Sequence, residues 1–329
     1  MTKILEKQTP IITTYPKDAN ALSILLTEEK ARPWIMNSFI QLTSYESQSL
    51  SYHDFYYRNC PLIEYQRIKK TNITAAGVTL IDFLINSINN GYYICLIVNV
   101  KYIKEYKTDQ KDFHDMFIYG YDDTNKIFHI SDNFQGKYRD GICTFDEMLS
   151  AITNNVKEGY DYMDFRDCIE LISYNPDDRA QLELYRIKES LTDFLYSSPT
   201  KNWYTMGLLW RDSENLLRTY GMDCYAAIEY HINSELNDYR WKLVFHLMWE
   251  HKKMMCLRLK YLKKNYCFNE LKNSISGYEE IESLARIALN LALKYSYTKN
   301  NSDLNEILKK YKVIQGNEKA VLQDTIQIL

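Results

Sequence analysis

A histidine and an aspartate at the two ends of an expected hairpin are the residues best placed to do chemistry. His114 opens one hydrophobic segment, HDMFIYGY, and Asp132 directly follows another, KIFHIS. Turn residues at 122–125 separate the segments, which predicts an antiparallel hairpin whose two ends lie side by side. A carboxylate beside an imidazole fixes its tautomer and stabilises its cation, as a general base of acyl transfer requires. Taken alone, such a pair would more often be a surface histidine and a turn aspartate.

The surrounding pattern favours the catalytic interpretation because it carries a family resemblance. A helix ends at Gly91 and is followed by the buried strand YYICLIVNV, then by His-Asp, a hydrophobic strand, Gly-Tyr-Asp-Asp, a turn, a second strand and Asp. This order resembles the papain-like cysteine-peptidase superfamily, in particular its C39-like branch and the butirosin-biosynthesis acyltransferase type. The resemblance covers residues 78–150 well and 15–77 loosely, and it implies an α+β fold.

The resemblance also assigns roles to individual residues. It implies that His114 is the general base and that Asp132 orients it, with Asn133 as the alternative orienting residue. It further implies a cysteine nucleophile at the start of the first helix, where the helix dipole and the imidazolium lower the pKa of a thiol. Asp18 is the expected cap of that helix, and the resemblance places the cysteine at the position that Ala19 occupies. Whether this alanine is natural or a deliberate replacement is left open.

Two further possibilities for the nucleophile remain. Cys60 is the alternative, because Pro61 would open a helix with Cys60 at its N-terminal cap. A chain without any nucleophile is the other. Gln8, eleven residues before Ala19, is a candidate oxyanion-hole donor. The remaining cysteines are expected to pack in the core.

Composition excludes several classes of protein. The chain has 329 residues, of which 46% are hydrophobic and 25% charged, as in globular proteins of about two domains. The net charge of -3 gives no basic footprint for nucleic acid. The seven cysteines have no metal-ligand spacing and predict reduced thiols. No signal peptide and no apolar stretch long enough to span a bilayer is visible. We therefore expect a cytoplasmic protein without metal, cofactor, nucleic-acid or membrane partner.

The sequence changes character near residue 176 and predicts two domains. Residues 1–176 mix strands and helices, and include a helix expected from Pro33 (PWIMNSFIQLTSY). After the Asn-Pro-Asp-Asp turn signal, residues 177–329 are expected to form an added all-helical domain. Its amphipathic runs are 179–197, 203–219, 222–265, 277–297 and 302–313.

The helical domain offers a basic helix face and one weak metal pattern. Lys253, Lys260 and Lys264 share one face of the segment that follows His251. Such a face is most often simply solvated, but it could dock an acidic carrier protein or a phosphopantetheine arm. His246 and Glu250 have the spacing of two metal ligands, yet HExxH is absent, and an ion pair on a helix face is expected instead.

Within the superfamily, the chain most resembles the papain-like amide-forming enzymes of nonribosomal assembly lines, including the type that acts in closthioamide biosynthesis. The resemblance implies an acyltransferase of antibiotic biosynthesis. A cysteine at position 19 would take an acyl group from a carrier-protein thioester and pass it to an amine. The carrier's phosphopantetheine presents the substrate, so the partners are a carrier protein and an amine acceptor. The alternatives are an intracellular cysteine peptidase and a non-catalytic binding protein of the same fold.

Overall fold

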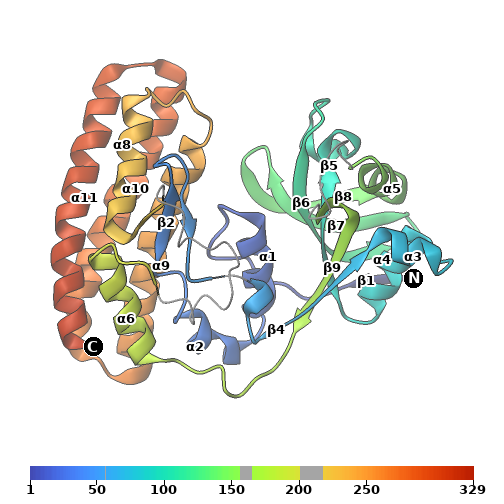
Figure 1. The fold of residues 1–329 in the computed structure, drawn as a ribbon, viewed down its shortest axis with the longest axis horizontal. Helices are drawn as coiled ribbons and strands as arrows, with labels where there is room; N and C mark the ends of the chain where they lie inside the picture. Colours follow the sequence, from blue (N-terminus) through green and yellow to red (C-terminus); the bar gives the residue numbers. More distant parts are fainter. Residues whose placement is uncertain (56, 156–164, 201–217) are drawn as a thin grey trace. The chain divides into compact units, whose positions relative to one another are not determined.

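The structure is a computed structural model that describes residues 1–55, 57–155, 165–200 and 218–329 (Figure 1). It mixes helices and strands and ends in a helical region, in agreement with the predicted α+β class. The chain divides into two compact units, one made of 1–31 and 60–179 and the other of 32–59 and 180–329. The change of unit between residues 179 and 180 lies close to the predicted boundary at 176. The assignment of 32–59 to the second unit was not predicted.

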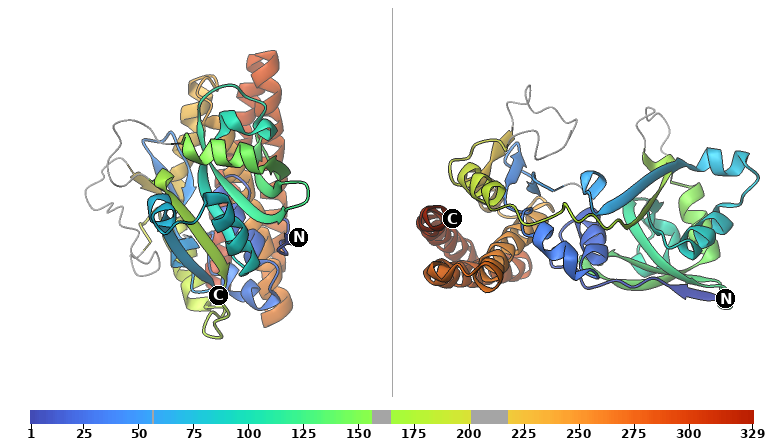
Figure 2. Two further views of the ribbon diagram at one scale, coloured as in Figure 1. Left: turned by 90° about the vertical axis from the view of Figure 1, so that its right-hand side faces the viewer. Right: turned by 90° about the horizontal axis from the view of Figure 1, so that it is seen from below.

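An antiparallel sheet forms the centre of the first unit. Among the described residues it has seven strands in the order β4-β9-β5-β6-β7-β8, with β1 pairing with β6. The strands are β1 (Thr2–Ile4), β4 (Ile63–Lys69), β5 (Tyr93–Asn99), β6 (Phe113–Asp122), β7 (Ile127–Phe134), β8 (Lys137–Thr144) and β9 (Cys168–Tyr174). Figure 2 shows β4 and β9 running side by side. The predicted hairpin is formed by β6 and β7.

Helices cover both faces of this sheet. They are α1 (Pro16–Leu25), α3 (Lys70–Ala75), α4 (Leu80–Asn89) and α5 (Phe145–Thr153), with short 3-10 helices η1 (Glu29–Ala31), η3 (Val100–Tyr102), η4 (Lys104–Tyr106) and η5 (Phe165–Asp167). Local signals define two of these helices. Thr79 caps α4, which ends before Gly91 with φ of 88°, and Thr144 opens α5 in a capping box with Glu147.

The two faces of the sheet carry different helices. Leu96 of β5 belongs to a hydrophobic core shared with Leu84 of α4 and Met148 of α5. Its neighbour Cys95 instead receives the side-chain amide of Asn20 from α1, 3.7 Å from its sulfur. Because successive side chains of a strand point to opposite faces, α1 lies on one face and α4 and α5 lie on the other. Figure 1 shows this arrangement.

The second unit is mainly helical. Its described helices are α2 (Arg32–Ile35), α6 (Leu184–Leu195), α8 (Tyr225–Asn233), α9 (Trp241–Tyr266), α10 (Lys272–Thr298) and α11 (Asn301–Ile328), with 3-10 helices η2 (Tyr57–Asn59), η7 (Gly221–Cys224) and η8 (Asn269–Leu271). The long helices α9, α10 and α11 pack side by side (Figures 1 and 2). No described helix is both long and apolar enough to cross a bilayer.

The second unit also corrects the expectation of an all-helical domain. It contains a small antiparallel sheet of β2 (Leu42–Tyr45), β3 (Ser51–Tyr52) and β10 (Arg218–Tyr220). The helix expected from Pro33 ends at Ile35, because the chain turns at Phe39 with φ of 63° and enters β2. Most of the helix expected at 203–219 lies outside the described residues, and its last two residues belong to β10.

Candidate functional site

The predicted contact between His114 and Asp132 is present. The register of β6 and β7 pairs Phe117 with Ser131, which brings the start of one strand to the end of the other. The Nδ1 atom of His114 lies 2.6 Å from Oδ2 of Asp132. The carboxylate is completely buried, whereas 35% of the histidine side chain is exposed. Because a carboxylate only accepts hydrogen bonds, Nδ1 carries the proton, and Nε2 has no protein partner among the described residues.

Tyr106 completes this site, and no pattern in the sequence indicated it. Its hydroxyl donates to the same Oδ2 atom of Asp132 that receives His114, while the other carboxylate oxygen accepts the N–H of Asn133 at 2.7 Å. Burial, followed by the charge of Asp132, raises the pKa of Tyr106 well above its usual range, so the phenol stays a donor. The ring of Tyr106 also packs edge-on against Phe134, with the ring centres 4.9 Å apart.

A web of contacts holds Tyr106 in place. Arg139, which lies opposite Asp132 on β8, donates to Oε1 of Glu105 at 2.7 Å. The side chain of Gln135 donates to the backbone carbonyl of Glu105, also at 2.7 Å. Gly141 leaves room for this approach, because a Cβ there would lie 2.8 Å from the side chain of Glu105. The 3-10 helix η4 is therefore fixed to the β7–β8 hairpin.

The electrostatic setting favours a charged imidazole. Burial by itself would lower the pKa of His114, but the hydrogen bond and the charge of Asp132 outweigh it. Asp115 and Asp112 add to the effect, and the pKa of His114 is raised above its usual value of 6.5. The neutral, proton-accepting form therefore predominates only above that raised value.

The structure does not bring Ala19 to this pair. Helix α1 begins at Pro16 rather than after Asp18, so Ala19 is its fourth residue and its N–H already donates to the carbonyl of Tyr15. Its side chain is fully buried. His114 shares its strand face with Met116, a member of the core under α4 and α5, whereas α1 packs on the opposite face. A thiol at position 19 would thus be separated from the imidazole by the sheet.

Two other predicted residues also lie on the α1 side. The side-chain amide of Asn133 donates to the carbonyls of Thr13 and Thr14, each at 3.3 Å, so it anchors the segment before α1 and does not orient His114. The N–H of Gln8 donates to the carbonyl of Ser23 in α1, at 2.9 Å. Gln8 therefore takes no part in the His114 site, and Asn133 contributes only its backbone N–H to Asp132.

Cys60 is not at a helix N-terminus, so this alternative is wrong in its structural premise. Pro61 leads through a turn into strand β4. That strand is separated from β6 by β9 and β5. Ile63, the first residue of β4, lies at the edge of the sheet where β5 begins. His114 lies toward the opposite edge, because it pairs with Val98 near the last residue of β5. Cys60 and His114 therefore lie far apart in the first unit.

The other thiols offer no evident replacement. Cys143 lies in the core of the first unit, and burial strongly raises its pKa, which keeps the thiol protonated. Cys95, Cys168, Cys224 and Cys256 are buried, as expected. Cys267 is exposed at the end of α9, which corrects the prediction that it packs in the core.

The predicted basic face lies on α9 of the second unit. Lys260 pairs with Glu279, with 2.6 Å between Nζ and Oε1, while Lys253 stands over the ring of Trp249 at 5.6 Å. Lys264 is exposed. Lys252 and Arg258 of the same helix are completely buried and add no charge to this face. The face is therefore less basic than the sequence indicates, and its docking role stays a prediction.

Comparison with known proteins adds no assignment. No protein-family model matches the chain, and no curated protein is significantly similar to it in sequence. The candidate site is therefore defined by the contacts of His114, Asp132 and Tyr106 in the first unit.

Proposed function

We propose that this protein transfers an acyl group from a thioester to an amine, with His114 as the general base. One observation carries the proposal: a buried carboxylate, held by Tyr106, binds Nδ1 of a partly exposed histidine and leaves Nε2 open. This arrangement gives a base with a fixed tautomer and a stabilised cation. The hairpin that carries it is also the part of the chain that resembles papain-like acyltransferases.

A direct transfer is the reaction that fits these residues best. Nε2 of His114 accepts a proton as the amine nitrogen attacks the thioester carbon. The C–N bond forms, the C–S bond breaks, and the imidazolium returns the proton to the leaving thiolate. An amine and a thioester thus give an amide and a thiol. This route needs no cysteine of the enzyme, in keeping with Ala19 and with the position of α1.

Asp132 and Tyr106 support the base without touching the substrate. The charge of Asp132 stabilises the imidazolium that forms during attack, and the hydroxyl of Tyr106 keeps this carboxylate hydrogen-bonded in its buried position. General-base catalysis of this kind contributes about 10²–10⁴-fold to a rate.

The donor in this proposal is an acyl carrier or peptidyl carrier protein of a nonribosomal pathway. The first unit would then be a papain-like domain that has lost its cysteine route. Lys253, Lys260 and Lys264 are the candidate docking residues for an acidic carrier, and Lys260 pairs with Glu279.

The test uses the full chain with acyl N-acetylcysteamine thioesters and a panel of amines. Amide formation is followed by mass spectrometry, because the exposed thiol of Cys267 would react with thiol reagents. We expect amide product that depends on His114 and disappears in His114→Gln. The matched control is His129→Gln, on the same hairpin, which should retain activity. Product that forms equally in His114→Gln would contradict the proposal.

The acyl-enzyme route is a distinct alternative. It requires a cysteine at position 19, so Ala19→Cys should form a covalent acyl adduct that intact mass detects. Because α1 lies across the sheet from His114, we expect no adduct that depends on His114. Hydrolysis of the thioester or of peptides without an amine requirement would instead indicate the peptidase alternative.

A non-catalytic binding protein is the second candidate function, and the burial of Ala19 together with the distant Cys60 favours it. It predicts no turnover with any thioester. Binding of a carrier protein by the wild-type chain without any turnover would separate it from the catalytic proposal.

A further inference from the structure

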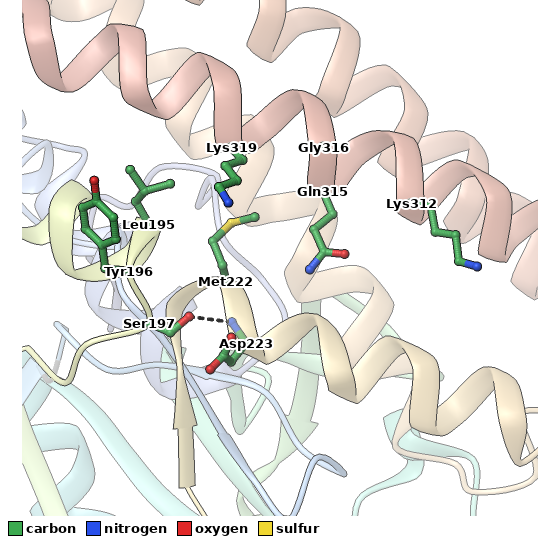
Figure 3. A pocket seen from close by; sticks show the side chains of 9 residues that line it. All are labelled: Leu195, Tyr196, Ser197, Met222, Asp223, Lys312, Gln315, Gly316 and Lys319. Atoms are coloured by element: carbon green, nitrogen blue, oxygen red, sulfur yellow. Dashed lines mark hydrogen bonds between the residues drawn. The ribbon is translucent and has the colours of Figure 1, made fainter.

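An open pocket lies in the second unit, and none of the residues that line it belongs to the His114 site. Its volume is about 600 Å³, within the range of small-molecule sites. One wall is a face of α11, and the others are the end of α6 and the short helix η7 (Figure 3). The side chains of Leu195 and Met222 are almost fully buried and line it with apolar surface.

The walls of this pocket are fixed relative to one another. The N–H of Asp223 donates to the hydroxyl of Ser197 at 3.0 Å, which ties η7 to the end of α6. Gly221, with φ of 52°, permits this approach, since a Cβ there would lie 2.1 Å from the carbonyl of Phe194. Glu318 on the far side of α11 binds Lys252 at 2.7 Å, which sets the rotation of that helix. These contacts therefore hold the walls of the pocket in fixed positions.

Charges of opposite sign line the pocket without pairing. Lys319 and Gln315 extend from α11 toward η7, which carries Asp223 (Figure 3). Among the described residues, none of these three side chains has an ion pair or a hydrogen bond. A ligand that carries both a negative and a positive charge could bridge them where the protein does not.

Gly316 widens the pocket on the α11 wall. It lies between Gln315 and Lys319 on the same helix face, and a Cβ added there would meet no atom within 4 Å. Glycine in the middle of a helix is unfavourable relative to alanine. No packing contact within the protein requires the absence of a side chain at this position. Space for a ligand is therefore a physical reason for the glycine.

We infer that this pocket binds a small zwitterion, an α-amino acid with an apolar side chain being the simplest. Lys319 and Gln315 hold its carboxylate, Asp223 holds its ammonium group, and the side chain lies against Leu195 and Met222. The inference is independent of the chemistry at His114.

Isothermal titration calorimetry on the full chain tests it with L-phenylalanine and L-leucine as probes. Two analogues each remove one charge: 3-phenylpropionate lacks the ammonium and 2-phenylethylamine lacks the carboxylate. We expect at least one amino acid to bind, and both analogues to bind about tenfold or more weakly than L-phenylalanine or L-leucine. Asp223→Asn and Lys319→Gln should each weaken amino-acid binding about tenfold, whereas Lys309→Gln, on α11 but outside the pocket, should not.

Gly316→Leu separates loss of the site from loss of the fold. It should fill the pocket and abolish binding while the melting temperature stays the same or rises, because a helix-favouring residue replaces glycine. Failure of both amino acids to bind at 10 mM would overturn the inference. So would equal binding of 3-phenylpropionate that Asp223→Asn leaves unchanged, since that would define a simple anion site.

Discussion

Two histidines, one in each unit, have pKa values shifted in opposite directions because their surroundings differ. His114 binds a buried carboxylate and keeps part of its ring exposed, and its pKa is raised. His251 is completely buried, donates from Nε2 to the carbonyl of Ile40 at 2.8 Å, and meets Nζ of Lys252 at 3.2 Å from Nδ1. Burial, followed by the charge of Lys252, lowers the pKa of His251 well below 6.5. The ring of His114 is partly accessible and binds a proton more readily, whereas the ring of His251 stays neutral.

The carboxylates of the two units repeat this contrast. Asp132 and Glu318 are both completely buried. Glu318 is bound by Lys252 through both oxygens and by Tyr225 at 2.6 Å, and all these groups are sealed in the core. Asp132 instead binds the ring of His114, which is partly exposed to solvent. The two buried carboxylates therefore differ in whether a partner is accessible, which is the case for Asp132 alone of the two.

Replacement of His114 should have the largest effect on activity. His114→Gln removes the proton acceptor, and we expect amide formation to fall about 10²–10⁴-fold. The free energy of unfolding should change little by comparison, because the ring is partly exposed. Mass spectrometry of the product and urea unfolding of the same protein measure the two quantities. A large loss of stability with unchanged activity would assign His114 a structural role.

Replacement of Glu318 should have the opposite profile. Glu318→Gln leaves the buried Lys252 without a counter-charge, which typically costs about 3–5 kcal/mol of unfolding free energy. Urea unfolding measures the loss. The matched control is Glu279→Gln, which breaks the half-exposed pair with Lys260 and should cost less than about 1 kcal/mol. Equal costs for the two variants would contradict the structural role given to the buried pair.

Replacement of Tyr106 should have an intermediate effect that reports on positioning. Tyr106→Phe removes a hydrogen bond to a charged group, which costs about 1.5–3 kcal/mol of stability. The carboxylate of Asp132 then loses one hydrogen-bond donor, so its negative charge acts more strongly on His114. The pKa of His114 should therefore rise further, and the acidic limb of the activity profile should move to higher pH. Tyr102→Phe is the control. An unmoved pH profile would show that Tyr106 does not act through Asp132.

The two histidines should respond to pH with opposite signs, and this is the smallest expected effect. The folded pKa of His251 is lowered, so below pH 6.5 the unfolded chain takes up a proton that the folded chain does not. Stability should then fall by at most about 1.4 kcal/mol per pH unit. His251→Gln, which can still donate to Ile40, should remove that slope. Urea unfolding between pH 5 and 7 measures it, and an unchanged slope in the variant would exclude His251 as its cause.

His114 provides the counterpart of this pH dependence. Its folded pKa is raised, so its contribution to stability is fully present below pH 6.5 and is lost as pH rises through the folded pKa. Activity should rise over the same interval, because the neutral ring is the base. A rate profile with its acidic limb below pH 6.5 would contradict the raised pKa.

The sequence by itself determined the local parts of this protein. The capping residues Thr79 and Thr144 mark where helices begin, and alternation and turn residues define the β6–β7 hairpin. Because a hairpin fixes which of its residues face each other, the contact between His114 and Asp132 was predictable from a stretch of nineteen residues. The mixed class of the fold followed from the same patterns.

Only the tertiary structure decided the rest of the site. Tyr106 reaches Asp132 from a 3-10 helix without hydrophobic periodicity, so no pattern pointed to it. Ala19 lies on the face of the sheet that α1 covers, and His114 lies on the other face. The strand order places Cys60 far from His114. The buried pair of Lys252 and Glu318 joins residues 66 positions apart in the sequence, so no local pattern indicated it. Such long-range contacts depend on how elements pack, which spacing along the chain does not encode.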